Sequence, residues 1–201
     1  MKNFIKDIED IAGIYFTDSS FRLINHEYNS FRIEGSSTAI NKIRNHKNQI
    51  KVLKWFKNFW VYFEIKFIEK DPYPNIFLTL SIFEGDVNDD YKIQLFRAEW
   101  DNHDDNLEHP QPHWHIYPFN SFEEYQTFKE LVTETAVSDD FDSFVTGSPK
   151  IVDLSQFHFA MNGQWYNEKG HHVNRISDNS ALINWISGVL GHIKYQLNYL
   201  N

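Results

Sequence analysis

The chain has 201 residues, a formal net charge of −9 and no cysteine. Its length is sufficient for one domain with a hydrophobic core of its own, and the absence of cysteine excludes disulfides and thiolate-bound metals. Aromatic residues make up 17% of the sequence, which favours a folded protein over a disordered one. An acidic chain is also poorly suited to broad, non-specific binding of nucleic acid, because such binding needs a basic surface.

The N-terminal segment carries charges throughout and has no apolar run of signal-peptide length. No segment of the sequence approaches the roughly 18 consecutive apolar residues that a membrane-spanning helix needs. We therefore expect a cytoplasmic protein without a membrane partner, which also agrees with the absence of cysteine.

The first predicted element is a short amphipathic helix over residues 3–12. Phe4, Ile8 and Ile11 recur there at helical spacing, so they form one apolar stripe. From about residue 14 to residue 118, the apolar residues follow the two-residue period of β-strands instead.

The clearest strand covers residues 58–68, where apolar side chains alternate with polar or amphipathic ones. This alternation is typical of an antiparallel sheet that is covered on one face only. Further strands are predicted over 76–83, 91–101 and 113–117. The segment 40–57, which is rich in lysine and arginine, is interpreted as a solvated sheet edge, with a local basic groove for nucleic acid as the alternative.

After residue 120 the apolar period becomes helical, and helices are predicted over 121–136, 153–161 and 179–199. The first of these opens with a capping box, in which Ser121 is followed three residues later by Glu124. The chain therefore reads as strands followed by helices, a pattern typical of the α+β class.

We expect residues 1–201 to form a single domain, with 1–118 mostly β and 119–201 mostly α. Its mainly antiparallel sheet, with strands within 14–118, would be packed by the N-terminal helix and the C-terminal helices.

The final predicted helix carries Tyr195, Tyr199 and His192 on the side away from its Leu and Ile stripe. Exposed aromatic residues one helical turn apart are typical of protein interfaces. This helix is therefore the predicted contact for a protein partner or for a second copy of the chain.

Two predicted strands on either side of an acidic loop carry the candidate site. Because side chains alternate along a strand, Arg97, Glu99 and Asp101 share one face of the first strand, and His113 and His115 share one face of the second. If the strands pair with Asp101 near His113, then Glu99 lies opposite His115. A register slip of one residue would separate the two sets.

Two imidazoles separated by one residue on a strand can chelate one metal ion, and a carboxylate from the next strand completes three ligands. We therefore expect His113, His115 and Asp101 to bind a divalent metal ion as cofactor. Glu99 would ligate or orient, and Arg97 would bind a phosphate or a developing charge. Without a metal, either histidine could act as a general acid or base oriented by one of the carboxylates.

The sequence “PHWHI” resembles the His-hydrophobic-His motif of rolling-circle replication initiators and related single-strand endonucleases. “FLTLSIF” (77–83) is similar to their first motif, and “YNEK” (166–169) is similar to their third. The resemblance implies a divalent metal on His113 and His115, and a nucleophilic Tyr166 that attacks a DNA phosphate.

“HWHIY” is also similar to the motif of histidine-triad nucleotide hydrolases, with Tyr117 where that family has a third histidine. The order Arg…Asp…His-Pro…His-x-His, from Arg97 to His115, resembles that of small bacterial proteins from toxin–antitoxin and antiphage-defence loci, including toxins of the TumE type. This resemblance implies a bacterial conflict setting.

Two functions are therefore expected as alternatives. The first is a metal-assisted or histidine-dependent phosphodiester hydrolase, resembling a nuclease, that acts on nucleic acid or a nucleotide. The second is a non-catalytic interaction subunit of a multi-component bacterial defence-type system. In that case the cluster of histidines and acids is structural, and the final helix binds the partner.

Overall fold

The computed structural model describes residues 2–43, 46–68, 75–89, 92–101, 109–117, 159–161, 174, 176 and 178–199. In chain order, its elements are α1 (Lys2–Gly13), β1 (Leu23–Glu27), β2 (Ser30–Ile33), β3 (Ser37–Ile43), β4 (His46–Phe56), β5 (Phe59–Ile68), β6 (Asn75–Glu84), β7 (Ile93–Asp101), β8 (His113–Ile116), β9 (Phe159–Ala160) and α4 (Asn179–Tyr199).

The predicted α+β class and the mainly antiparallel sheet are confirmed. Both terminal helices and the four strands predicted between residues 58 and 117 have nearly the expected bounds. The helix predicted over 121–136 lies outside the described residues. The helix predicted over 153–161 is wrong at its end, because residues 159–160 form β9 and pair with β8.

All nine strands of the described chain belong to one sheet, and each paired set is antiparallel. The main order is β1-β2-β5-β6-β7-β8-β9. The β3–β4 hairpin joins through the end of β4, which pairs with the beginning of β5, whereas β2 pairs with the end of β5. The sheet therefore forks at β5, because β2 and β4 pair with different ends of this strand. The β3–β4 hairpin can consequently lie outside the plane of the main sheet.

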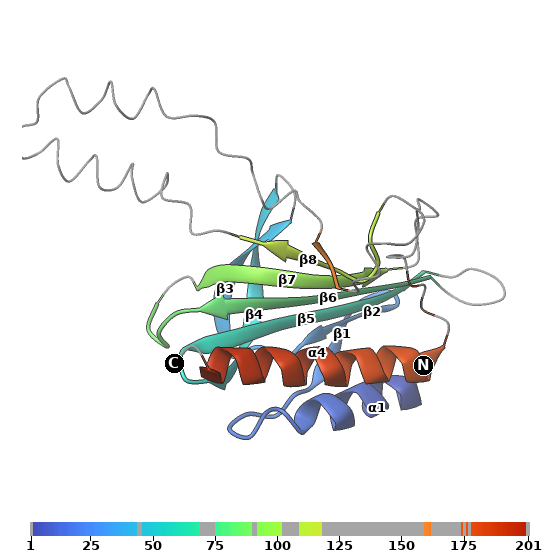
Figure 1. The fold of residues 1–201 in the computed structure, drawn as a ribbon. Coiled ribbons are helices and arrows are strands. Elements are labelled where there is room, and N and C mark those ends of the chain that lie inside the picture. The colour runs from blue at the N-terminus through green and yellow to red at the C-terminus, as the bar shows by residue number, and fades with distance from the viewer. Residues whose placement is uncertain are drawn as a thin grey trace, which may run out of the picture.

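The helices α1 and α4 lie side by side against one face of the sheet (Figure 1). Phe4 of α1 packs on Phe67 of β5 with 6.1 Å between ring centroids, and Trp185 of α4 packs on Trp100 of β7 at 5.6 Å. The predicted apolar stripe of α4 is buried as expected: Leu182, Ile186, Val189, Ile193 and Leu197. Burial of apolar surface on this face is the main stabilising contribution to the fold.

The opposite face of the sheet is polar, and it is covered as well, so the prediction of a sheet covered on one side is wrong. Trp60, Tyr62 and Glu64 of β5 point to this face and are only 2%, 3% and 8% exposed. The β3–β4 hairpin covers part of it, and Gln94 of β7 donates a hydrogen bond to the Asn41 side chain of β3 at 2.9 Å. We call this surface the polar face; its side chains include Tyr62, Glu64, Thr79, Ser81, Arg97, Glu99, His113 and His115.

The basic segment 40–57 therefore contributes more than the solvated edge that was predicted. Lys47 and Lys51 are exposed, but Val52 and Trp55 of the same strand are fully buried. Among the described residues, no helix is long and apolar enough to span a membrane.

One row of directly paired residues crosses the polar face from β2 to β8. It consists of Arg32, Glu64, Thr79, Glu99 and His113. Because neighbouring strands lie about 4.8 Å apart, the backbones at Glu64 and Glu99 are separated by about 10 Å. The carboxylates of Glu64 and Glu99 therefore lie on the same face but contact different neighbouring residues.

Candidate metal centre

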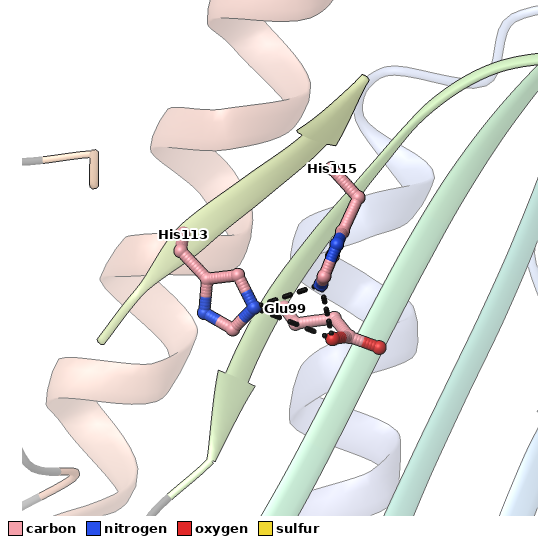
Figure 2. Close-up of side chains that lie close together, drawn as sticks. All are labelled: Glu99, His113 and His115. Atoms are coloured by element: carbon pink, nitrogen blue, oxygen red, sulfur yellow. Dashed lines mark hydrogen bonds and ion pairs between the residues drawn. The ribbon is translucent and has the colours of Figure 1, made fainter. Parts of the chain in front are cut away.

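Glu99, His113 and His115 point toward one another on the polar face (Figure 2). β7 supplies Glu99, and the neighbouring strand β8 supplies both histidines, which share a face because one residue separates them. His113 is the direct strand partner of Glu99. His113 is fully buried and His115 is 4% exposed, whereas Glu99 is half-buried.

The observed register differs by two residues from the one predicted. Glu99 lies opposite His113 rather than His115, and Arg97 lies opposite His115. A shift of two residues leaves every side chain on its original face, whereas a shift of one would not. The predicted site residues consequently remain on one surface, with different nearest neighbours.

Asp101 lies at the end of β7, beside Gln111 rather than His113. Gln111 donates a side-chain hydrogen bond to the Asp101 carboxylate at 2.9 Å and accepts one from its backbone N–H at 3.0 Å. In the described part of the chain, the group close enough to share one metal ion contains Glu99 with His113 and His115. The geometry therefore favours Glu99 over Asp101 as the carboxylate ligand, and ligation is one of the two roles predicted for Glu99.

The three side chains bring one ligand atom each to a common point. His115 Nε2 lies 2.9 Å from His113 Nε2 and 2.9 Å from Glu99 Oε2, and His113 Nε2 lies 3.4 Å from the same carboxylate oxygen. Ligand atoms held at about 2.1 Å from one ion lie about 3.0 Å apart at right angles and about 3.4 Å apart at tetrahedral angles. The observed separations therefore match those of ligands around a single ion.

Hydrogen bonds alone cannot pair these three atoms favourably with one another. A carboxylate only accepts hydrogen bonds, and each nitrogen of a neutral imidazole either donates or accepts. If His113 and His115 both donate to Glu99, their two N–H groups oppose each other at 2.9 Å. If only one donates, the lone pair of the other faces the carboxylate. A cation at the common point would attract all three atoms at once.

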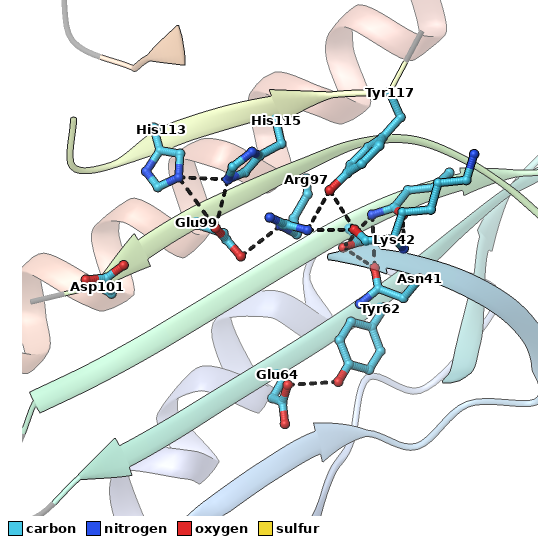
Figure 3. Close-up of polar contacts among 12 residues, drawn as sticks. Asn41, Lys42, Tyr62, Glu64, Arg97, Glu99, Asp101, His113, His115 and Tyr117 are labelled. Atoms are coloured by element: carbon cyan, nitrogen blue, oxygen red, sulfur yellow. Dashed lines mark hydrogen bonds and ion pairs between the residues drawn. The ribbon is translucent and has the colours of Figure 1, made fainter. Parts of the chain in front are cut away.

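Arg97 holds the carboxylate of Glu99 in position. This arginine is 2% exposed, and its Nε forms an ion pair with Glu99 Oε1 at 2.8 Å, which leaves Oε2 facing the histidines. Its Nη1 donates to the Lys42 carbonyl at 2.7 Å and to the Tyr117 hydroxyl (Figure 3). These contacts support a positioning role for Arg97 more directly than the predicted binding of a phosphate.

The charges around Glu99 favour its ionised form. Burial opposes ionisation, but hydrogen bonds with His113 and His115 and the charge of Arg97 outweigh it, so the pKa of the Glu99 carboxyl lies well below its usual range. A metal ion requires the deprotonated carboxylate as a ligand, and the surroundings of Glu99 supply that form.

A third histidine lies beside the group. The His109 ring is half-buried and packs on the His113 ring, with 4.7 Å between centroids and 51° between planes. Its position follows from the loop before β8, where strand periodicity gives no guidance. Tyr166, which the endonuclease resemblance implies as a nucleophile, lies outside the described residues.

No protein-family model, curated protein or solved structure matches this chain.

Proposed function

We propose that this protein binds one divalent metal ion through Glu99, His113 and His115 and uses it to hydrolyse a phosphodiester. The observation that carries the proposal is the convergence of two imidazole nitrogens and one carboxylate oxygen within 3.4 Å of one another. Two histidines and one glutamate form the protein ligand set of several zinc hydrolases, which keep a further position open for water.

The residues of the proposed centre would have different roles. Glu99, His113 and His115 would hold the ion, while Arg97 keeps the second oxygen of Glu99 away from it. A bound ion supplies a Lewis acid and lowers the pKa of a coordinated water molecule. The Glu99 side chain is 22% exposed, so the group is not closed off completely from solvent.

A phosphodiester substrate is supported by the resemblance of “PHWHI” to single-strand endonucleases and of “HWHIY” to nucleotide hydrolases. Both resemblances rest on the same two histidines, His113 and His115. We accordingly propose nucleic acid or a nucleotide as the substrate, in the bacterial conflict or defence setting that the wider His and Asp pattern implies.

The ligand geometry also favours a second kind of metal chemistry. Two of the three separations are 2.9 Å, which corresponds to ligands at right angles rather than at tetrahedral angles. Two histidines and one carboxylate on one side of a six-coordinate ion form the usual site of non-haem iron(II) oxygenases. An oxygen-dependent reaction is therefore the second candidate, and a requirement for dioxygen would distinguish it from hydrolysis.

The first test is the metal content of the protein purified without chelators, measured by inductively coupled plasma mass spectrometry. We expect about one ion per chain in the wild type and none after replacement of both His113 and His115 by alanine. His192→Ala, which removes an exposed histidine from α4, is the matched control and should retain the ion.

Hydrolysis of bis(p-nitrophenyl) phosphate should be lost with EDTA and restored by the ion that the protein carries. Circular dichroism of the double variant establishes that its fold is retained. A wild-type protein that takes up no manganese, iron or zinc at micromolar concentration would overturn the proposal.

The two tyrosines of the α4 face that was predicted to bind a partner are exposed. Tyr195 and Tyr199 are 69% and 80% exposed, which keeps a non-catalytic interaction subunit as an alternative function. In that case, Tyr195→Ala with Tyr199→Ala should abolish partner binding, while the double histidine variant should retain it. The opposite result would favour the metal-dependent function.

A further inference from the structure

Three side chains of the main sheet bind the backbone of Lys42, close to the end of β3. Figure 3 labels two of them, Arg97 and Tyr117. Gln94 Oε1 accepts a hydrogen bond from the Lys42 N–H at 2.6 Å. Arg97 Nη1 and the Tyr117 hydroxyl both donate to the Lys42 carbonyl, at 2.7 and 2.6 Å. One edge of β3 pairs with β4. At its other edge, the Lys42 N–H and carbonyl form hydrogen bonds with side chains from β7 and from Tyr117, which directly follows β8.

The neighbouring residue Asn41 strengthens this attachment. Its side-chain oxygen accepts hydrogen bonds from Gln94 at 2.9 Å and from Ser81 at 3.3 Å. Asn41, Ser81 and Gln94 are at most 3% exposed. Because buried polar groups without partners are costly, the hairpin is held in one place on the polar face.

The attachment of the hairpin leads directly to the candidate metal centre. Arg97 binds the Lys42 carbonyl through Nη1 and Glu99 through Nε. Since the guanidinium group is planar and rigid, fixing its Nη1 atom also fixes the position of the positive charge that pairs with Glu99 Oε1. The orientation of the Glu99 carboxylate therefore depends on a backbone carbonyl of a strand that contributes no ligand.

We infer that Arg97 and Tyr117 are positioning residues of the metal centre, and that docking of the β3–β4 hairpin and metal binding stabilise each other. The inference rests on the metal-binding function proposed above. Tyr117 holds the Lys42 carbonyl and Arg97 together, because its hydroxyl contacts both. By linkage, an ion that favours the observed orientation of Glu99 also favours the docked hairpin.

A matched pair of tyrosines on the polar face tests this inference. Tyr117 and Tyr62 are 8% and 3% exposed, and the hydroxyl group of each donates one hydrogen bond. The acceptor of Tyr62 is Glu64, which is not part of the metal group. Tyr117→Phe should weaken Co²⁺ binding about 10-fold and alter the absorption spectrum of bound Co²⁺. Tyr62→Phe should leave both the affinity and the spectrum unchanged.

Urea unfolding of both variants without metal gives the change in the free energy of unfolding that each lost hydroxyl causes. This change is thereby separated from any effect on the metal centre. Equal Co²⁺ affinity and equal spectra in the two variants would overturn the inference while leaving the metal centre intact. If the wild type binds no Co²⁺, the proposed function and the inference both fail.

Hydrogen exchange of the wild type provides a second measurement that does not depend on a variant. Bound Co²⁺ should slow exchange of the β3 backbone amides, including that of Lys42, more than exchange in α1, which packs on the other face. Equal slowing in β3 and α1 would show that the ion stabilises the whole fold without coupling to the hairpin, and it would contradict the inference.

Discussion

Glu64 and Glu99 lie two strands apart in the same row of the polar face, and each pairs with an arginine. Arg32 Nε lies 2.7 Å from Glu64 Oε1, and Arg97 Nε lies 2.8 Å from Glu99 Oε1. In both cases burial opposes ionisation, yet the neighbouring groups outweigh it and lower the pKa of the carboxyl. The two sites are therefore similar in their charge pairing and in the direction of the pKa shift.

They differ in what surrounds the second oxygen. Glu64 Oε2 accepts a hydrogen bond from the Tyr62 hydroxyl at 3.0 Å, and its other oxygen has Arg32, Ser30 and Lys66 as neighbours. All of these groups donate hydrogen bonds or carry positive charge. Such an arrangement is complete without any ligand, so we interpret the Glu64 cluster as a structural ion pair between β2 and β5.

The second oxygen of Glu99 instead faces two imidazole nitrogens, which are possible metal ligands. A lowered pKa therefore does not by itself identify a functional carboxylate, because structural ion pairs lower it too. The identity of the neighbouring atoms, donors at Glu64 and potential ligands at Glu99, separates the two cases.

The largest expected effect comes from neutralising each glutamate in turn. Glu99→Gln should weaken binding of the divalent ion by about 100-fold or more, because it replaces an anionic ligand by a neutral amide. Glu64→Gln should leave the affinity nearly unchanged. Isothermal titration with Mn²⁺ or Zn²⁺ measures both constants. Similar losses in the two variants would mean that the polar face acts as one electrostatic unit, and the comparison would break down.

Thermal unfolding should also distinguish Glu99 from Glu64, with a smaller effect. An ion at about 100 times its dissociation constant adds about 2.7 kcal/mol to the free energy of unfolding. For a chain of this size, that corresponds to an increase of about 5–10 °C in Tm. The increase should occur in the wild type and in Glu64→Gln but not in Glu99→Gln. An equal increase in all three proteins would place the ion elsewhere.

Much of the sheet could be predicted from the sequence because its period is visible in single strands. The strands over residues 58–68 and 91–101 and the helix over 179–199 were located by alternation or by helical spacing alone. The common face of Arg97, Glu99 and the two histidines followed from the same period, because it depends only on odd and even positions.

The register and the cover of the polar face could not be predicted in this way. A shift of two residues preserves every hydrophobic pattern, so the sequence could not choose between Asp101 and Glu99 as the closer neighbour of His113. The hairpin attachment at Lys42 depends on a backbone carbonyl, which has no signature in the sequence. Pairing between β2 and β5 is non-local, so no single segment reveals it.

The smallest expected effect concerns the response of stability to acid. Burial raises the pKa of Glu64, but Arg32, Lys66 and Tyr62 lower it further, so the folded value lies below the ordinary value. The resulting stabilisation is fully present above about pH 4.5 and is lost as the pH falls through the folded pKa, because the unfolded chain then binds more protons.

Urea unfolding of the metal-free protein at about pH 6 and at about pH 4 should therefore show a smaller acid-induced loss for Glu64→Gln than for the wild type, by about 1 kcal/mol or less. Glu34→Gln is the matched control, because this glutamate is exposed and should leave the wild-type dependence in place. If Glu64→Gln loses as much stability in acid as the wild type does, Glu64 does not form the structural ion pair assigned to it. The contrast with Glu99 would then have to rest on metal affinity alone.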